Sequence, residues 1–324
     1  KEAVDRQIQE ILSPITPKNP REDKEFFSKM RFNDLERLYK EHFGNAAHFN
    51  VCLVGDLSEA EAKRLVTTYL AALPGDAKQP RKDFTPADYA ARDFTSKERV
   101  IDRSFVVETP GDMGEVELSF LLDQPKLDER QTLALSLLEP LLQNVLFDEL
   151  REREQATYSI AVNANHVEEP IERATLSIHF STSREKADHL KARTLDILRN
   201  MAAGHIDNDA FKKVQIPLIL DEESGDKAAA GELGLGVWLA LLSNYVETGK
   251  VPQLPLANGS NKSSVNTNKS ATAPTSSAPA PTVRVSDVKA ADLSAVLQRL
   301  LNDARQRFIV VKSQAPEDKK WEHN

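Results

Sequence analysis

The sequence lacks the residues from which many metal and redox sites are built. It has a single cysteine, Cys52, among 324 residues, which excludes internal disulfides and zinc sites made of several thiolates. No two of its seven histidines are four residues apart. Neither H-E-x-x-H nor H-x-x-E-H, the spacings that place two zinc-binding histidines on one helical face, is therefore present.

Long apolar runs and excess positive charge are also missing. No apolar run approaches the ~20 residues needed to cross a bilayer. A net charge of −8 and a pI near 5.5 argue against nucleic-acid binding, which requires clustered Lys and Arg. The first residues show no signal peptide and already read as an amphipathic helix, which is expected of a fragment or a processed chain.

The segment from residue 99 onward has the pattern of a complete α/β domain. Residues 100–107 and 115–122 alternate as strands, with a turn at 110–112 between them. Residues 127–151 carry a broad leucine stripe, typical of a helix packed on a sheet. Residues 158–164 and 174–180 are predicted to pair as a hairpin, and helices and a final strand are expected further along.

The segment before it is predicted to be only part of a domain. It contains helices near 3–12, 23–30 and 33–43, one alternating strand near 49–57, and a helix beginning at Ser58. One strand is too few for a stable sheet. We therefore expect residues 1–75 to be the C-terminal part of a preceding domain, 76–98 a linker, and 99–324 a complete domain with a disordered insertion at about 256–282.

Arg151 and Tyr158 are the candidate functional residues, because they flank the turn between the long helix and the strand that follows. A guanidinium and a phenol both donate hydrogen bonds, which suits a peptide carbonyl whose oxygen gains charge during hydrolysis. A structural interpretation is also open. An Arg in a last helical turn complements the helix dipole, and a Tyr at the start of a strand reflects β propensity.

Two segments resemble the pitrilysin/insulysin family of inverzincin zinc metallopeptidases. The first is 150–159, where Leu150, Arg151, Glu152, Tyr158 and Ser159 match the family pattern Leu-Arg-Glu-Lys-x-Gly-x-x-Tyr-Ser. Gln155 stands where the family usually has Gly. The second is 48–74, which resembles the strand, Gly-Asp turn and helix that finish a preceding family domain.

The resemblance implies an α+β fold of two-layer sandwich domains, with a mostly antiparallel sheet and helices on one face, one domain partial and one complete. It implies a C-terminal, non-catalytic portion of a zinc metalloendopeptidase in which zinc and the general base belong to an N-terminal catalytic half. That half is expected on the same polypeptide or on a separate subunit. The family's equivalents of Arg151 and Tyr158 help to hold the peptide substrate in an enclosed chamber.

Other interpretations stay open. The chain fits a catalytically inert paralogue that acts as a scaffold or partner subunit, or a stand-alone binding domain. His166 and His179 lie on adjacent predicted strands and could face each other, although no Cys or carboxylate completes a metal site there. Localisation is open; the family includes bacterial periplasmic enzymes, so a periplasm or an organelle lumen is the expectation.

Overall fold

The structure is a computed structural model that describes residues 2–16, 19–20, 22–80, 85–91, 93, 95–109, 111–155, 157–168, 171–229, 239, 242–243, 245–246 and 283–314. Within these ranges the side chains of 2–6, 86, 158 and 223–229 are not described. The predicted insertion at 256–282 lies outside the described residues.

The chain divides into two compact units. The first comprises Lys1–Pro20, Phe84–Ile219 and Val283–Asn324, and the second comprises Arg21–Asp83 and Leu220–Thr282. The predicted domain boundaries at 75 and 98 stay predictions.

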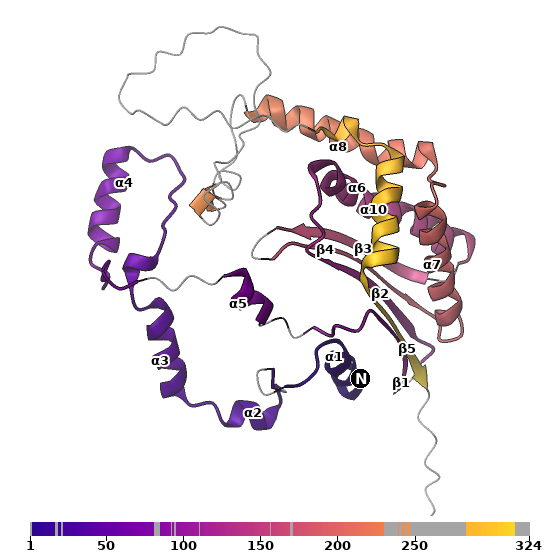
Figure 1. Cartoon of the computed structure of the whole chain (residues 1–324), viewed down its shortest axis with the longest axis horizontal. Coiled ribbons are helices and arrows are strands. Elements are labelled where there is room, and N and C mark those ends of the chain that lie inside the picture. The colour runs from indigo at the N-terminus through magenta and orange to yellow at the C-terminus, as the bar shows by residue number, and fades with distance from the viewer. Residues whose placement is uncertain are drawn as a thin grey trace, which may run out of the picture. The chain divides into compact units, whose positions relative to one another are not determined.

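The first unit is built on one sheet (Figure 1). Its described strands are β1 (Val100–Glu108), β2 (Gly114–Asp123), β3 (Thr157–Val167), β4 (Arg173–Thr182) and β5 (Arg305–Gln314). Their order is β1-β5-β2-β4-β3, with β1 and β5 parallel and the other neighbours antiparallel. The mixed, mostly antiparallel sheet confirms the predicted fold class.

The helices that lie wholly in this unit are α1 (Glu2–Leu12), α5 (Pro86–Ala91), α6 (Glu129–Leu146), α7 (Ala187–Ala202) and α10 (Ala290–Asp303). Helix α8 (Asn208–Ala229) begins in this unit, and its residues from Leu220 onward belong to the second unit. A π-helical segment, η3 (Phe147–Arg153), continues α6, and a short 3₁₀ turn, η4 (Val285–Asp287), precedes α10. Asp128 caps α6 by accepting the N–H of Gln131 at 2.8 Å. Asp207 caps the start of α8 in the same way, accepting the N–H of Ala210 at 2.7 Å.

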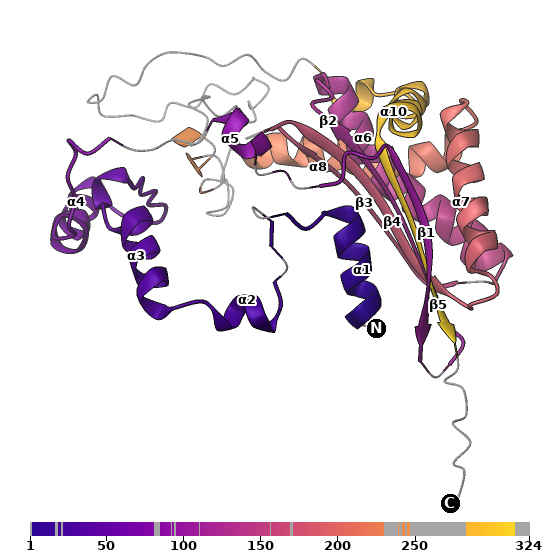
Figure 2. The same ribbon diagram turned by 60° about the horizontal axis from the view of Figure 1, so that its bottom comes forward.

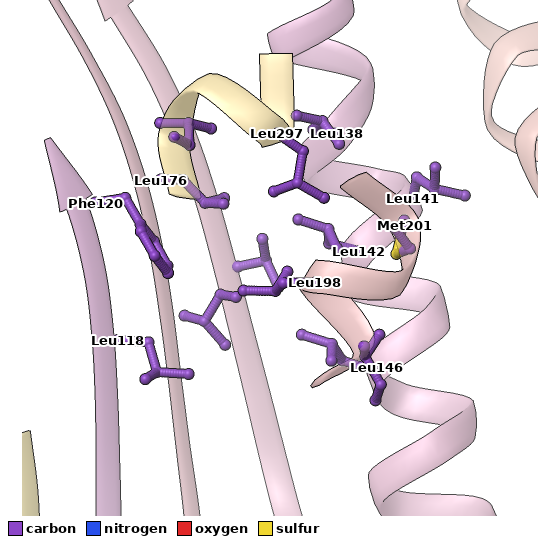
Figure 3. Close-up of a cluster of buried hydrophobic side chains, with 14 of the residues drawn as sticks. Leu118, Phe120, Leu138, Leu141, Leu142, Leu146, Leu176, Leu198, Met201 and Leu297 are labelled. Carbon is purple, nitrogen blue, oxygen red and sulfur yellow. The ribbon is translucent and has the colours of Figure 1, made fainter. Parts of the chain in front are cut away.

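The main core lies between the sheet and helices α6, α7 and α10 (Figures 2 and 3). Leu118, Phe120 and Leu176 project from the strands toward leucines of α6 and toward α7 and α10 (Figure 3). The side chains labelled there are almost completely buried: Leu118, Phe120, Leu138, Leu141, Leu142, Leu146, Leu176, Leu198, Met201 and Leu297. At about 1.5–3 kcal/mol for each fully buried side chain, this cluster is a large source of stability for the unit.

The described part of the second unit consists mainly of helices. They are α2 (Lys24–Ser28), α3 (Phe32–Phe43), η1 (Ala46–His48), α4 (Glu59–Leu65) and the π-helical η2 (Val66–Leu70). Ser58 caps α4 by accepting the N–H of Glu61 at 3.2 Å, as its sequence context predicts.

The predicted strand at 49–57 is wrong for this structure, which assigns these residues no strand. The side chains expected to be half buried, Phe49, Val51 and Leu53, are 45%, 56% and 48% exposed. The alternating pattern is present, but no partner strand pairs with it among the described residues, and an unpaired segment has no ladder of hydrogen bonds.

Candidate functional site

Arg151 lies on η3, where the chain leaves α6. Leu150 beside it is completely buried and anchors this segment in the core. Arg151 itself is exposed, and its guanidinium carbon lies 4.7 Å from the centroid of the Phe147 ring. A guanidinium over a ring face is attracted by the ring quadrupole, so Phe147 limits the directions that Arg151 can take while leaving its donors in solvent.

The turn after η3 depends on Gln155, whose φ is +47°. This left-handed conformation is uncommon for residues with a side chain and is readily adopted by glycine. Gln155 is the position at which the family pattern has Gly. The backbone therefore makes the turn that the pattern requires, although the sequence departs from it.

The backbone of Tyr158 lies in β3 at an irregularity. Thr157 pairs with Thr182 and Ser159 pairs with Ser181, so the register of β3 against β4 shifts at Tyr158. A bulge of this kind bends a strand and redirects side chains. The Tyr158 side chain lies outside the described residues, and the predicted convergence of Arg151 and Tyr158 stays a prediction.

Ion pairs connect the segment around Arg151 to α7. Glu149 pairs with Arg153 at 2.5 Å and with Arg193 at 2.7 Å. The Arg193 Nε also lies 3.4 Å from Glu154, whose other carboxylate oxygen is 3.0 Å from the His189 Nε2. Arg193 therefore contacts a residue before and a residue after Arg151, which restricts how far the two ends of the segment can separate.

A cavity of about 580 Å³ adjoins this network on the helical layer. It is formed by residues of α6, η3, α7, the start of α8 and the α7–α8 connection, and the side chains bordering it include Val145, Glu149, Arg193, Met201, His205 and Lys213. Its lining combines apolar side chains with side chains of both signs of charge. Arg151 does not border it.

His166 and His179 do not face each other. In the β3–β4 register, His166 pairs with Ala174 and His179 pairs with Ala161. Because paired residues share a face and neighbours along a strand alternate, the two histidines lie on opposite faces of the sheet. The hypothesis that they face each other across adjacent strands is wrong.

His166 belongs instead to a partly buried polar cluster. Its Nε2 lies 3.1 Å from Glu172 and its Nδ1 lies 3.3 Å from the Thr132 hydroxyl. Glu172 also accepts the backbone N–H groups of Lys126 and Leu127, each at 2.8 Å. Burial alone would raise the pKa of Glu172, but the Leu127 N–H, His166 and the Lys126 N–H together hold this pKa below its usual value. With its carboxylate oxygens occupied in this way, Glu172 holds the loop before α6 in place.

A second charged cluster involves residues that sequence analysis did not single out. Asp93 lies 2.9 Å from Arg173, and Asp123 lies 2.7 Å from Arg305. Burial alone would raise the pKa of Asp93, but Lys97, Thr95 and Arg173 hold it well below its usual value. These residues are scattered in sequence, so no local motif could have indicated the cluster.

The described residues do not fit a zinc site. No group of three or more His, Cys, Asp or Glu side chains in them is arranged to hold a metal ion. We therefore assign no step through zinc to the described residues. None of the helices described is long and apolar enough to cross a membrane.

Comparison with protein families identifies the chain's relatives. The profile of the family described as "Peptidase M16 inactive domain" matches residues 29–218, more than half of the sequence. The chain belongs to this family. The match confirms the resemblance to pitrilysin-type metallopeptidases and to their non-catalytic portion. Among proteins with curated descriptions, none matches the sequence significantly.

Solved structures have the same fold. The ferredoxin protease FusC in complex with Arabidopsis ferredoxin matches 97% of this chain and 30% of its own, with 13% identity and a TM-score of 0.66. Pitrilysin matches 99% of this chain and 32% of its own, with 12% identity and a TM-score of 0.54. A peptidase M16 inactive domain from Pseudomonas fluorescens matches 97% of this chain and 65% of its own, with 13% identity and a TM-score of 0.57. This chain thus spans between about a third and two thirds of these structures, and identities this low establish the fold alone.

Proposed function

We propose that this chain is the substrate-clamping, non-catalytic part of a zinc metalloendopeptidase that hydrolyses peptides in an enclosed chamber. An N-terminal catalytic half, on the same polypeptide or on a separate subunit, supplies the zinc and the general base. The observation that carries the proposal is the placement of Arg151. Its exposed guanidinium lies on a segment that is anchored by a buried leucine and tied to α7 by ion pairs.

The physical role follows from the chemistry of the guanidinium. The carbonyl oxygen of a peptide gains negative charge as water attacks, and a fixed cationic donor stabilises that charged state more than the bound substrate. Anchoring matters because the donor is then oriented before the reaction, without reorganisation during it. The Tyr158 hydroxyl is proposed as a second donor to the same peptide backbone.

Complementation tests the proposal. The chain is mixed with a candidate catalytic half of the family and zinc, and cleavage of a quenched fluorescent peptide is followed. We expect cleavage to require both components. Arg151→Ala is expected to lower turnover by about 10²–10³-fold, the usual cost of losing such a donor.

Arg199→Ala is the matched control, because Arg199 is an exposed arginine of α7 that pairs with exposed Asp196. It removes the same charge and is expected to leave turnover unchanged. Equal turnover of wild type and Arg151→Ala would contradict the clamping role.

A second candidate function is a catalytically inert paralogue that serves as a scaffold or partner subunit. Gln155 favours it, because the chain has not kept the glycine suited to this turn. In the same experiment, a stable complex with the catalytic half that never cleaves peptide would support the scaffold and exclude the clamp.

A further inference from the structure

The two edges of the sheet differ in how their backbone groups are occupied. At the β3 edge, Gln143 of α6 donates to the Ile160 carbonyl at 2.9 Å and accepts the Val162 N–H at 3.0 Å. Glu139 of α6 accepts the Ala164 N–H at 2.9 Å. These side chains occupy groups that would otherwise be available to another strand, and a covered edge does not recruit one.

The opposite edge is β1. The Gln306 N–H donates to the Arg99 carbonyl at 2.6 Å, and the Thr109 N–H donates to the Gln314 carbonyl at 3.0 Å. Alternate residues of a parallel strand bond to the same neighbour. Odd-numbered residues from 99 to 109 therefore bond to β5, and even-numbered residues point their N–H and C=O groups outward.

The five outward residues are exposed: Val100, Asp102, Ser104, Val106 and Glu108. The outward backbone groups of these five residues form one hydrogen bond among the residues that the structure describes. It runs from the Arg103 guanidinium to the Asp102 carbonyl at 2.9 Å. The Lys191 ammonium holds the Asp102 carboxylate at 2.8 Å and leaves the backbone uncovered. Helix α1 contacts β1, but no hydrogen bond between the described residues joins α1 to these outward backbone groups. An edge of nine residues in this state is a template for another strand.

We propose that β1 binds an extended peptide as an additional strand at this edge. The outward groups alternate donor and acceptor and repeat every two residues, about 6.6–6.8 Å, which an extended polypeptide backbone matches. The proposal goes beyond the clamping function and does not rest on Arg151 or Tyr158.

The side chains favour a peptide over a second copy of this chain. Val100 and Val106 are 45% and 57% exposed. Antiparallel pairing of two copies centred on Ser104 would place Asp102 opposite Val106 and Glu108 opposite Val100. Each valine would then face a carboxylate across the strands, which is a poor cross-strand pair. A peptide with apolar side chains opposite the valines and lysine opposite the carboxylates avoids this.

The probe is the blocked peptide Lys-Thr-Val-Thr-Ser-Thr-Lys-Thr-Val, designed to pair antiparallel with its first lysine opposite Glu108 and its last valine opposite Val100. Amide hydrogen exchange of the full chain is measured residue by residue with and without excess peptide. We expect exchange at Asp102, Ser104 and Val106 to slow by at least about tenfold, with little change at odd-numbered residues already bonded to β5.

Two N-methylated peptides are the matched ligands. Methyl groups on the third, fifth and seventh nitrogens block the edge that faces β1, and methyl groups on the fourth and sixth nitrogens block the edge that faces away. We expect the first peptide no longer to protect the even-numbered β1 amides from exchange, and the second to protect them as the parent peptide does. Equal protection by both, or no protection by the parent peptide, would overturn the proposal.

Ser104→Pro removes an outward N–H without removing a β1–β5 hydrogen bond, and Ser104→Thr keeps that N–H. We expect the proline variant to bind the probe at least about tenfold more weakly than the threonine variant. If the proline variant does not fold, Val106→Glu replaces it and is expected to weaken binding in the same way. If Ser104→Pro and Val106→Glu both bind the probe peptide as tightly as Ser104→Thr does, the proposal is overturned.

Two further outcomes are informative. Protection of the even-numbered amides that rises with protein concentration in the absence of peptide would show self-association and overturn the choice of occupant. Arg151→Ala is expected to leave the protection pattern unchanged, so failure of the clamping function and failure of the edge site are distinguishable.

Discussion

Gln155 adopts a left-handed backbone conformation, with φ of +47°, two residues before the first residue of the strand that carries Tyr158. A residue with a Cβ atom pays about 1–2 kcal/mol for this conformation, and glycine does not. The turn is thus made by a residue unsuited to it, and the surrounding contacts must compensate. The contacts beside the turn include the ion pairs of Glu149 and Glu154 with Arg193 and the contact of Glu154 with His189.

Replacing Gln155 with glycine is expected to raise the free energy of unfolding by about 0.5–1 kcal/mol, after the greater freedom of glycine in the unfolded chain is subtracted. Chemical denaturation measures the change. Gln155→Ala keeps the Cβ atom and is the control, expected to give no gain. If the glycine variant were less stable than the alanine variant, the claim that the backbone is strained at Gln155 would be contradicted.

At the scale of elements, η3 is held from two directions. Its buried Leu150 packs into the core, and Arg193 of α7 contacts Glu149 and Glu154 on either side of Arg151. The side chain of Arg193 is 41% exposed and that of Glu149 is 19% exposed, so solvent screens the pair only partly. The network therefore orients the segment more than it stabilises the whole unit.

A double-mutant cycle on Glu149→Gln and Arg193→Ala is expected to give a coupling free energy of about 0.5–1 kcal/mol. Local motion should change more than global stability. Amide exchange between residues 150 and 155 is expected to accelerate in either single variant, whereas exchange in β2 should stay as it is. Unchanged exchange in 150–155 would show that the network does not hold the turn.

The sequence predicts elements well where the signal is local. The leucine stripe predicts the helix up to Arg151, and alternation predicts β3 and β4 and their pairing. It does not predict that α6 widens into a π-helical segment or that Gln155 turns left-handed, because neighbours distant in sequence, such as Arg193, help to fix that geometry. The residue types of Arg151 and Tyr158 and their separation in the sequence indicate a candidate pair. That separation does not determine how the two side chains are oriented relative to each other.

At the scale of the whole molecule, the charged cluster of Asp93, Arg173, Asp123 and Arg305 joins four separate parts of the chain. It fixes the segment before β1 to β4, to the end of β2 and to the start of β5. The Arg305 guanidinium also donates to the Ser96 carbonyl at 2.7 Å. The end of the predicted linker is thus held against the sheet in the first unit.

The cluster predicts a dependence of stability on pH. The pKa of Asp93 is lowered in the folded state from an ordinary value of 3.8, so its contribution is complete above that value and is lost as pH falls through the lower, folded pKa. Asp93→Asn is expected to lower the free energy of unfolding at pH 7. The difference from wild type should shrink below about pH 4.

The control for this prediction is Asp196→Asn, because Asp196 is 64% exposed and pairs with Arg199 on the surface of α7. It is expected to differ little from wild type at either pH. Thermal unfolding at a series of pH values measures both variants. If the difference in stability between wild type and Asp93→Asn stays constant down to pH 3, the lowered pKa of Asp93 in the folded state is contradicted.

Long-range topology is the part of the fold that the sequence does not predict. Residues 100–107 and 115–122 read as neighbouring strands joined by a turn, yet β5 lies between them and pairs with both. The placement of β5 between β1 and β2 depends on contacts between residues about 200 positions apart in the sequence. The periodicity of a local segment carries no information about such contacts. The alternation at 49–57 likewise predicts a strand, but a strand forms only where a partner strand pairs with it. None of the described residues pairs with this segment.

The central claim is that Arg151 stabilises the charged state of a peptide during hydrolysis. The most direct measurement is the affinity of a phosphinic peptide, whose tetrahedral anion resembles that state, for the zinc-loaded complex of this chain with the proposed catalytic half. The account predicts that Arg151→Ala weakens this affinity by about 10²-fold or more while KM for the matching substrate changes little. Equal weakening of the phosphinic peptide and the substrate, or no weakening of either, would contradict it.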